Sequence, residues 1–520
     1  MLTKSKIKEI LSNRIEELSS SNLPHFLLLN QIDKAAKRIV KAIQNREKIT
    51  VVGDYDVDGV SSSAIMKLFF EKLGYDMEVV IPDRFKEGYG LTTKLLAKID
   101  ADLIITVDNG ITSFEAAEEC EKRGVDLIIT DHHTPLIMDN VKCKMENEGI
   151  FKLPNALAVV NPKTSPDFPF KEICGAEVAW YLCAAVKNEM KLKIDLREFT
   201  DILALAIIAD VMPLTHMNRT LVNMGLKRLN AALKPFSKAL KRFFNREFTS
   251  EDIAFQIAPR LNAAGRMAHA YAAYEFLVSE DENRAFDLLM QLDGYNNLRK
   301  KTEKEAVESI EVENEDFIVV KGDYHEGVVG IIASRLVHKY KKPAIVLCEK
   351  EDVLKGSGRS LGNIDIFELV NGCGELLEGF GGHKMACGLA VKKENFEILK
   401  SKLNENIKKY GEKDFFIDDY VLGELPFSEI DIELLDILKS FEPYGEGNPK
   451  PKFTANAKIE HVQNLKDNHF KLILSQDDII LPAVIFRFDG EFGEEISFKF
   501  SVGENNYYGR SVQLMIEELI

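Results

Sequence analysis

Short apolar runs alternate with amphipathic helical segments over the first third of the chain. The apolar runs at 49–52, 77–81, 101–107 and 125–130 are rich in Val and Ile, and helical spacing of apolar residues marks 34–43, 60–75, 91–99 and 113–124. Continuous β-branched runs are typical of strands that are buried on both faces. This regular exchange of strand and helix predicts an α/β fold with a doubly wound parallel sheet.

The pattern changes twice further along the chain. Residues 281–311 contain one glycine and no proline, which predicts a long connecting helix, and a second α/β segment follows at 316–350. In that segment, the glycine-rich stretches 356–366 and 379–389 are expected to be loops whose backbone N–H groups can face an anion. We therefore expect a helical segment at 1–48, a first α/β domain at 49–280, the connecting helix at 281–311 and a second α/β domain at 312–412.

Short alternating strands dominate the last hundred residues. They lie at 454–462, 469–476, 479–488, 495–502 and 511–519 and are separated by turn residues, which predicts a small OB-like β-barrel within 413–520. Most aromatic side chains on such strands belong to the core, but some can present a face to a ligand. The candidates are Phe453, His469, Phe470, Phe486, Tyr507 and Tyr508.

Three aspartates follow the first predicted strand at alternate positions, Asp54, Asp56 and Asp58. If the chain stays extended there, the three side chains share one face, and unpaired carboxylates held together raise one another's pKa values. A divalent cation relieves this repulsion, and oxygen ligands suit Mg²⁺ or Mn²⁺. The alternative for any single aspartate is a helix N-cap.

Other predicted strands also end in metal-binding residue types. Asp108 follows the third strand, and Asp131, His132 and His133 follow the fourth. Because parallel strands place their carboxyl ends along one edge, these side chains can meet the first cluster and hold two cations. Asp210 ends a later apolar run and is expected to add a fifth carboxylate, although an aspartate at a helix end beside a Pro turn has a simpler explanation.

Composition narrows the class of protein. The formal net charge is −16, which disfavours a protein that coats nucleic acid through a basic surface but allows an enzyme with a local basic channel. No apolar run reaches the roughly 20 residues needed to cross a bilayer, and the N-terminus is not a secretory signal. The seven cysteines form no CxxC pair, so a reducing cytoplasm is expected.

Two segments are basic, although the chain as a whole is acidic. Residues 225–246 hold seven Lys or Arg and no acidic residue, which predicts either a solvated helix face or one wall of a phosphate-tracking groove. Residues 259–267 place Arg260, Asn262 and Arg266 among small residues. Small residues allow close backbone approach and arginines suit phosphate, so these three are candidate substrate contacts.

These motifs resemble the DHH phosphoesterase superfamily and, within it, the RecJ family. The superfamily motifs are GDYDVDG at 53–59, VDNG at 107–110, DHH at 131–133, ADVMPL at 209–214 and a GGHxxAxG-like stretch at 381–388 in which Cys387 replaces a small residue. RFKEGYG at 84–90, PRLNAAGRM at 259–267 and PYGEGNPKP at 443–451 resemble the RecJ branch in particular. The resemblance covers almost the whole chain in motif order, and it implies a DHH domain, a DHHA1-type second domain and the OB-like barrel.

The resemblance also implies roles for single residues. Asp56 and Asp108, assisted by Asp54, would hold one Mn²⁺ or Mg²⁺, and the second ion would be held by Asp58, Asp108, His132 and Asp210. His133 would contact the scissile phosphate or support the ligands. Substrate phosphates would be bound by Arg266, Arg359, Ser360 and His383, and the path of the strand would be lined by Arg84 and Tyr89.

The implied activity is single-stranded-DNA-specific 5′-to-3′ exonucleolytic hydrolysis to 5′-mononucleotides, in recombination and repair. The expected partners are single-stranded DNA, a single-strand-binding protein and a helicase, and we expect a cytoplasmic monomer with no membrane contact. One alternative is a DHH/DHHA1 phosphodiesterase for short oligonucleotides, cyclic dinucleotides or polyphosphate, which leaves the C-terminal barrel without a role. The other, a non-catalytic scaffold, predicts eroded acidic motifs, whereas every expected carboxylate and histidine is present.

Overall fold

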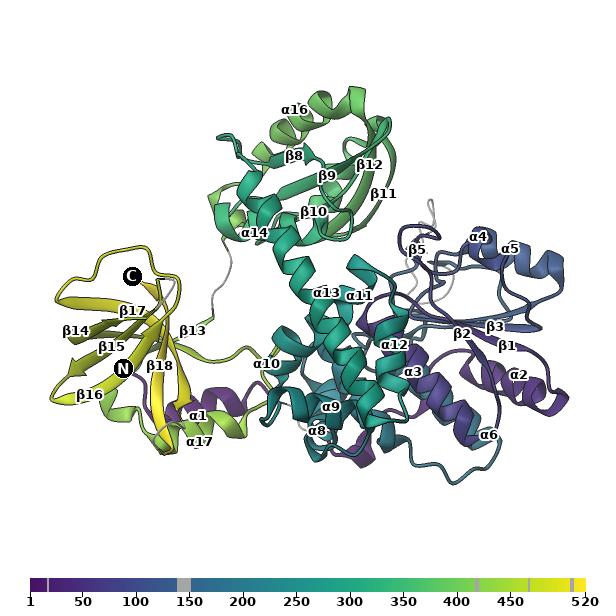
Figure 1. Ribbon diagram of the computed structural model, residues 1–520, viewed down its shortest axis with the longest axis horizontal. Helices are drawn as coiled ribbons and strands as arrows, with labels where there is room; N and C mark the ends of the chain where they lie inside the picture. Colours follow the sequence, from purple (N-terminus) through teal and green to yellow (C-terminus); the bar gives the residue numbers. More distant parts are fainter. Residues whose placement is uncertain (16–17, 138–150, 417–419, 466–467, 506–508) are drawn as a thin grey trace.

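The molecule has three lobes around a long helix (Figure 1). The computed structural model describes residues 1–15, 18–137, 151–416, 420–465, 468–505 and 509–520. A parallel-sheet domain with its helices forms one lobe, a smaller α/β domain sits at one end of helix α13 (Glu282–Ser309), and a β-barrel forms the third lobe. Helix α13 is the long connecting helix that the sequence predicts.

The first sheet is parallel throughout and has the strand order β2-β1-β3-β4-β7. Its strands are β1 (Ile49–Val52), β2 (Glu78–Val80), β3 (Leu103–Val107), β4 (Asp126–Thr130) and β7 (Ala158–Val160). The strands are short and, in β1 and β3, buried at every residue, as expected for strands covered on both faces. All their carboxyl ends therefore lie along one edge.

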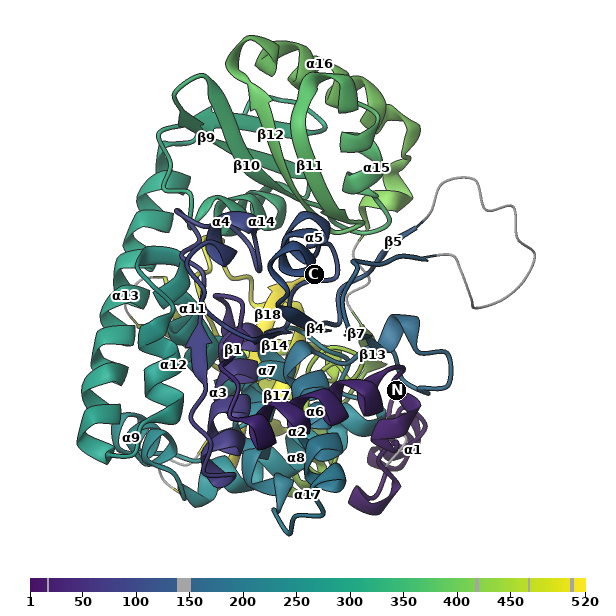
Figure 2. The same cartoon turned by 90° about the vertical axis from the view of Figure 1, so that its right-hand side faces the viewer.

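Helices cover both faces of this sheet (Figure 2). One face packs on α2 (Ile32–Asn45), α3 (Val57–Lys72) and α6 (Gly175–Glu189), and the other packs on α4 (Thr93–Leu96) and α5 (Phe114–Arg123). The predicted doubly wound sheet is confirmed. The helix expected at 91–99 is only the short α4.

A helical layer extends the larger core below the sheet. It consists of α7 (Thr200–Ala209), α8 (His216–Ala231), α9 (Pro235–Phe244), α10 (Ser250–Asp252), a π-helical turn (Ile253–Ile257), α11 (Ala258–Met267) and α12 (Tyr271–Val278). The first half of α13 packs into the same core through Leu288, Leu289 and Leu292. A two-stranded ribbon, β5 (Leu136–Ile137) with β6 (Phe151–Lys152), projects from the sheet domain.

The second α/β domain has a mixed sheet in the order β11-β12-β10-β9-β8. Its elements are β8 (Ile318–Gly322), α14 (Val329–Tyr340), β9 (Ala344–Lys350), β10 (Val353–Arg359), α15 (Ile366–Asn371), β11 (Leu377–His383), β12 (Ala386–Lys392) and α16 (Phe396–Asn406). The expectation of a glycine-rich loop at 379–389 is wrong, because most of these residues lie in β11 and β12. In 356–366, residues 356–359 belong to β10, and only 360–365 form a loop. A Cβ on Gly356 would lie 2.0 Å from the Val346 carbonyl oxygen, so glycine permits this close strand pairing.

The C-terminal lobe is a closed five-stranded barrel, since β14 pairs with both β15 and β17. Its strands are β14 (Lys452–Asn464), β15 (Phe470–Gln476), β16 (Ile479–Ile485), β17 (Glu495–Asn505) and β18 (Ser511–Leu519), with β13 (Val421–Glu424) beside β14 and helix α17 (Ile432–Ser440) below. The predicted OB-like barrel is confirmed. Phe453 is in its core, Phe486 is exposed, and Tyr507 and Tyr508 lie outside the described residues.

The N-terminal helix packs on this barrel lobe. Ile7 and Leu11 of α1 (Lys4–Ser12) are fully buried in the barrel core, and the Leu2 N–H donates to the Glu424 carbonyl oxygen at 2.8 Å. The two ends of the chain therefore share one hydrophobic core, which the sequence pattern did not indicate. No helix within the described ranges has both the length and the apolar content to cross a membrane.

Candidate metal centre and substrate cleft

The acidic loop after β1 turns into a helix earlier than the sequence suggests. Helix α3 begins at Val57, and Asp56 is its N-cap, accepting hydrogen bonds from the N–H groups of Asp58 (3.0 Å) and Gly59 (3.1 Å). The three aspartates therefore do not share one extended face, and that expectation is wrong. The turn instead directs Asp54 and Asp56 to one group and Asp58 to another.

Asp108 lies between these groups. It has a left-handed backbone (φ 62°), which points its carboxylate back across the ends of the strands. The next residue, Asn109, donates to the carbonyl oxygens of Val52 (3.0 Å) and Val107 (2.9 Å), which ties β1 to β3 at this turn. Asp108 is 1% exposed, so the position of its carboxylate is fixed by packing on all sides.

The two histidines after β4 have different environments. His132 is buried, its Nε2 lies 3.3 Å from Asp108 Oδ1, and burial lowers its pKa to about 4, so the imidazole is neutral and can coordinate a metal. His133 is half-exposed and its Nδ1 lies 2.7 Å from Asp131 Oδ1. Burial opposes protonation of His133, but this hydrogen bond and the Asp131 charge raise its pKa to about 9.

Asp210 approaches from outside the sheet as the C-cap of α7. Its Oδ2 lies 3.5 Å from His132 Nε2, which completes a group with Asp58. In each of three groups the candidate ligand atoms lie within 4.8 Å of one another: Asp54 with Asp56 and Asp108, Asp58 with His132 and Asp210, and Asp108 with His132 and His133. The structure thus brings together all seven residues proposed for the centre.

The centre fits divalent cations. Four of its buried polar atoms have no hydrogen-bond partner within the described residues: Asp54 Oδ1, Asp108 Oδ1, Asp210 Oδ2 and His132 Nε2. Burial, and after it the neighbouring carboxylates, raises the pKa values of Asp54, Asp56, Asp108 and Asp210. Buried acceptors without donors are costly, and a hard cation bound by oxygen and one imidazole removes that cost.

A cleft of about 610 Å³ opens beside the centre, between the sheet domain and the second α/β domain. Three guanidinium groups line it, those of Arg84, Arg266 and Arg359. Arg84 lies 4.9 Å from the ring centre of Tyr55, and burial lowers the pKa of Arg266 to about 10. The cleft thus sets fixed positive charge and aromatic faces opposite a carboxylate cluster.

Tyr89 reaches the centre from the loop after β2. It is 44% exposed, and its hydroxyl lies 3.3 Å from the Asp108 carbonyl oxygen and 3.4 Å from both ring nitrogens of His133. Its ring also meets Tyr55 edge-on. The position of Tyr89 agrees with its predicted place along the substrate path.

The other predicted substrate contacts lie elsewhere. Arg260 is buried, pairs with Asp293 at 2.8 Å and stacks on two phenylalanines, so it stabilises the helical core instead of contacting phosphate. Asn262 Oδ1 accepts the Val57 N–H and positions the start of α3. Ser360 is buried and donates its hydroxyl to the Ile364 carbonyl oxygen, whereas His383 is exposed near Arg359.

The sequence analysis named Asp131 without giving it a role, and it missed a backbone contact at the start of α6. Asp131 accepts from the N–H groups of Ile111, His132 and His133 and orients the His133 ring. The N–H groups of Gly175 (2.6 Å) and Ala176 (2.8 Å), at the start of α6, donate to Asp58. The DHH triplet could have indicated the role of Asp131, whereas no local sequence pattern indicated the contact of Gly175 and Ala176 with Asp58.

The basic segment 225–246 lies in α8 and α9, away from this cleft (Figure 1). Lys234, Lys241 and Arg246 form ion pairs with Asp201, Glu247 and Asp252. Of the two alternatives for this segment, the structure therefore favours a solvated, ion-paired helix face over a wall of a phosphate-tracking groove.

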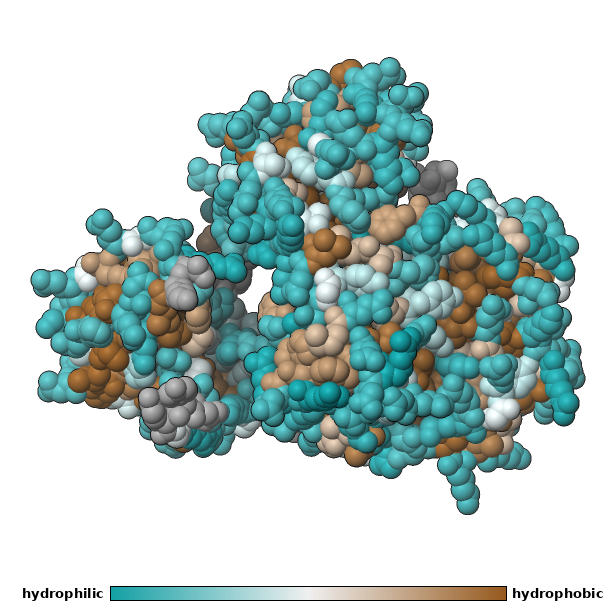
Figure 3. Space-filling model, in the orientation of Figure 1, coloured by the Kyte–Doolittle hydropathy of each residue, from teal (hydrophilic) through white to brown (hydrophobic). Residues whose placement is uncertain are grey.

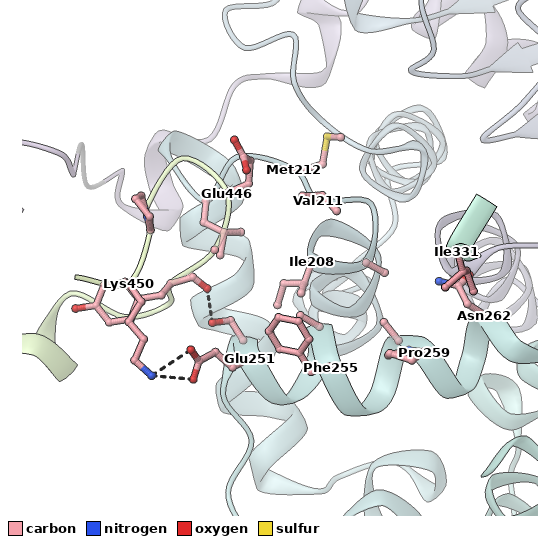
Figure 4. Close-up of a pocket in the computed structure, with 18 of the residues that line it drawn as sticks. Ile208, Val211, Met212, Glu251, Phe255, Pro259, Asn262, Ile331, Glu446 and Lys450 are labelled. Carbon is pink, nitrogen blue, oxygen red and sulfur yellow. Dashed lines mark hydrogen bonds and ion pairs between the residues drawn. The ribbon is translucent and has the colours of Figure 1, made fainter. Parts of the chain in front are cut away.

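Two further cavities lie where the three lobes approach one another, around an opening that is visible in Figure 3. One, of about 590 Å³, is lined mainly by apolar side chains of α7, the π-helical turn and α11, and by residues 444–450 of the barrel lobe (Figure 4). The other, of about 620 Å³, is lined by five basic residues (Arg299, Lys300, Lys304, Arg335 and Arg487), by Val307 and by two glutamates. Glu303 pairs with Arg299 and Arg335, and Glu308 pairs with Lys304. Arg266 lines both the cleft and the first cavity, and Arg299 lines both cavities, so neighbouring spaces share one lining side chain each.

Comparison with known protein families identifies three family domains along the chain. Residues 48–207 match the DHH family, N-terminal domain, residues 314–409 match the DHHA1 domain, and residues 422–518 match the RecJ OB domain. These three matches follow the order of the three lobes.

Curated relatives and solved structures are similar over most of the chain. The single-stranded-DNA-specific exonuclease RecJ of Bacillus subtilis is 36% identical over 93% of this chain, which spans 63% of that relative. RecJ of Haemophilus influenzae is 32% identical over 94% of this chain and 90% of its own length. The crystal structure of Thermus thermophilus RecJ in complex with Mn²⁺ has a TM-score of 0.81 at 29% identity and covers 95% of this chain and 72% of the other.

Proposed function

The chain belongs to the RecJ family, and from this premise we propose that it is a single-stranded-DNA-specific exonuclease. It degrades the strand from the 5′ end to 5′-mononucleotides, uses two Mn²⁺ or Mg²⁺ ions, and serves DNA recombination and repair. The observation that carries the proposal is the carboxylate cluster facing a cleft lined by Arg84, Arg266 and Arg359.

Two ligand sets are proposed for the ions. Asp54 and Asp56 would hold one, and Asp58, His132 and Asp210 would hold the other. Asp108 would serve both, because its carboxylate is grouped with Asp54 and Asp56 and its Oδ1 lies 3.3 Å from His132 Nε2. When bound, such ions act as Lewis acids toward the phosphate and lower the pKa of the attacking water.

The protein's own groups position the substrate. The three arginines bind phosphate oxygens of the 5′ nucleotide and its neighbour, and Tyr55 and Tyr89 offer aromatic faces to a base. His133 is protonated at neutral pH, since its pKa is raised to about 9, and it donates a hydrogen bond to a phosphate oxygen near the scissile bond. Asp131 holds its ring for this contact.

We propose that the strand continues from the cleft through the two central cavities. The apolar cavity accepts bases beside Phe255, which is 73% exposed, and the basic cavity follows the phosphates with Lys300 and Lys304. We propose that this path is too narrow for a duplex and so gives selectivity for single strands.

End-labelled DNA tests this proposal. With Mn²⁺, the purified chain should release mononucleotides from the 5′ end of a single strand, degrade blunt duplex much more slowly, and lose all activity in Asp108→Ala. Equal rates on blunt duplex and on single strands would overturn the proposed path.

A small-substrate phosphodiesterase is the alternative with the same chemistry. Removing the barrel is a poor test, because α1 and the sheet domain both pack on that lobe. Lys300→Glu with Lys304→Glu is sharper, since both side chains are distant from the metal groups along α13. It should slow digestion of long strands while leaving dinucleotide hydrolysis unchanged, whereas a small-substrate enzyme would keep both.

We further propose a cytoplasmic monomer that works with a helicase and a single-strand-binding protein, because these proteins generate and hold single strands. The six described cysteines are free and buried, which suits a reducing compartment. The limits 1–48, 49–280, 281–311, 312–412 and 413–520 remain our proposed division of the chain. Sedimentation of the purified chain tests the monomer.

A further inference from the structure

The carboxylate of Asp210 is less enclosed than those of Asp58 and Asp108. Its side chain is 29% exposed, whereas those of Asp58 and Asp108 are 2% exposed. Asp58 receives two backbone N–H groups, but Asp210 Oδ2 has no hydrogen-bond partner among the described residues. The position of Asp210 therefore depends on the backbone that follows it.

That backbone makes a strained turn. Val211 has φ 55°, a left-handed conformation that β-branched residues rarely adopt, and it is 63% exposed, so its side chain gains little by packing. The N–H groups of Val211 and Met212 return to the carbonyl oxygens of Ile208 (3.2 Å) and Ile207 (3.0 Å) to end α7. Such a conformation persists only when its surroundings hold it.

The barrel lobe provides these surroundings through residues 442–450, which we name the 442–450 loop. The Leu214 N–H donates to the Glu446 carbonyl oxygen at 2.7 Å, and a Cβ on Gly445 would lie 2.8 Å from the Leu214 side chain. Gly447 has φ +71°, and a Cβ there would lie 3.1 Å from the Pro213 ring. Figure 4 shows Val211 and Met212 on one side of the apolar cavity and Glu446 and Lys450 on the other.

The 442–450 loop is itself held rigidly against the sheet domain. The buried Arg219 guanidinium, on α8, donates to three successive carbonyl oxygens at 2.7–3.3 Å, those of Phe441, Glu442 and Pro443. Inside the loop, Asn448 donates to two of the same oxygens, and Ser250 donates its hydroxyl to the Tyr444 carbonyl oxygen at 2.6 Å. These contacts fix the start of the loop to the sheet domain and close the loop on itself, which allows it to hold the 211–215 turn in place.

We infer that the 442–450 loop of the barrel lobe is a positioning element for the metal centre: it holds the turn after Asp210 and so sets the carboxylate that completes the second ion's ligand set. This inference rests on the proposed two-ion function and adds that the nucleic-acid-binding lobe and the catalytic centre are built as one unit. Residues in the loop touch neither ion nor phosphate in this role. Their effect passes through Asp210.

Manganese binding without turnover tests the inference. In the chelator-stripped chain, the electron paramagnetic resonance signal of free Mn²⁺ gives the number and affinity of bound ions. Gly447→Val places a branched side chain against Pro213 and should weaken one ion by about tenfold while leaving the other unchanged, as displacing the support of a metal ligand typically does. Asp210→Asn should weaken the same ion and identifies it.

Gly124→Val is the matched control. Gly124 has φ +69°, and a Cβ added there would have no atom within 4 Å, so the substitution adds similar backbone strain far from the turn. It should bind both ions as the wild type does. Leu214→Ala, which removes the contact with Gly445 without backbone strain, should weaken the same ion as Gly447→Val and keeps the test available if that variant does not fold.

The outcomes distinguish the inference from the proposed function. Intact binding of both ions by folded Gly447→Val or Leu214→Ala overturns the inference alone, and so does equal weakening of both ions. A wild-type chain that binds fewer than two ions overturns the proposed function, and the inference with it.

Discussion

Gly175→Ala is the substitution that most directly tests how the metal centre is packed. Gly175 starts α6, and its N–H donates to Asp58 Oδ2 at 2.6 Å. A Cβ at this position would lie 2.5 Å from Asp108 Cβ and 2.7 Å from Asp108 Cα. Real Cβ atoms do not approach so closely, and the Asp108 backbone cannot swing away because it is already left-handed and buried.

The cost can be worked out in two parts. Separating α6 from the Asp108 turn is overpacking of a full core, which costs about 1–3 kcal/mol of unfolding free energy. The same shift displaces the shared carboxylate and lengthens the hydrogen bond to Asp58, and such changes around a metal reduce its affinity by about 10–100-fold. The packing cost is present without metal, whereas the loss of metal affinity is seen only when metal is added.

Urea unfolding with and without Mn²⁺ separates these parts. In chelator, the unfolding free energy of Gly175→Ala should be lower than that of the wild type by the packing cost. Added Mn²⁺ should raise the unfolding free energy of the variant less than that of the wild type, because the stabilisation by a bound ion grows with the ratio of its concentration to its dissociation constant. Gly294→Ala, in the middle of α13 with no atom near its Cβ, is the control and should be stabilised by about 0.5–1 kcal/mol. Equal stability and equal response to Mn²⁺ in Gly175→Ala would refute the reasoning.

Three other predictions concern charge. Lys234→Met leaves the fully buried Asp201 unpaired and should cost about 3–5 kcal/mol in urea unfolding, with part recovered by adding Asp201→Asn. Burial raises the pKa of Glu177 from 4.5 to about 8, so the folded state holds a proton that the unfolded state releases; stability should fall as pH rises across this window and stay flat in Glu177→Gln. Arg359→Ala should raise KM for single-stranded DNA about tenfold, whereas Arg260→Lys should lower stability and leave KM unchanged, because only Arg359 lines the cleft.

The residues at the carboxyl edge of the sheet could be predicted from the sequence, because they depend on patterns between neighbouring residues. When a run of β-branched residues is followed by Asp or His, the sequence predicts both where the strand ends and which side chain lies at its end. Parallel pairing then brings Asp54, Asp108 and His132 together without further information. This is why the residues of the centre could be named before the structure was known.

The parts that were wrong depend on contacts distant in sequence or on small backbone differences. Asp56 caps α3 because the helix starts at Val57, which alternation of aspartates cannot show. Arg260 resembled a phosphate ligand, but its guanidinium pairs with Asp293 on another helix. The glycines of β10 and β11 serve strand pairing, and a glycine-rich stretch alone does not distinguish that role from an anion-binding loop.

The N-terminal helix and the 442–450 loop illustrate a stronger limit. Ile7 and Leu11 show only that α1 has an apolar face; that this face packs on a barrel more than 400 residues later follows from the completed fold. Likewise, the role of Arg219 is invisible until the three carbonyl oxygens to which it donates are in place. Interfaces between lobes are selected by shape, which a pattern of apolar positions does not encode.

An acidic net charge is compatible with a polyanionic substrate, because binding depends on the charges that line the site and not on the sum over the whole chain. Five carboxylates of the centre point into one small volume, and the raised pKa values of four of them record how unfavourable that is without cations. Two divalent cations would offset four of these five negative charges, whereas the charge of His133 is paired with Asp131. Three arginines and Lys355 line the cleft beside the carboxylates, together with Glu326 and Glu378, so basic groups lie where a phosphate would approach the centre. An acidic net charge is therefore compatible with a local cleft that binds phosphate.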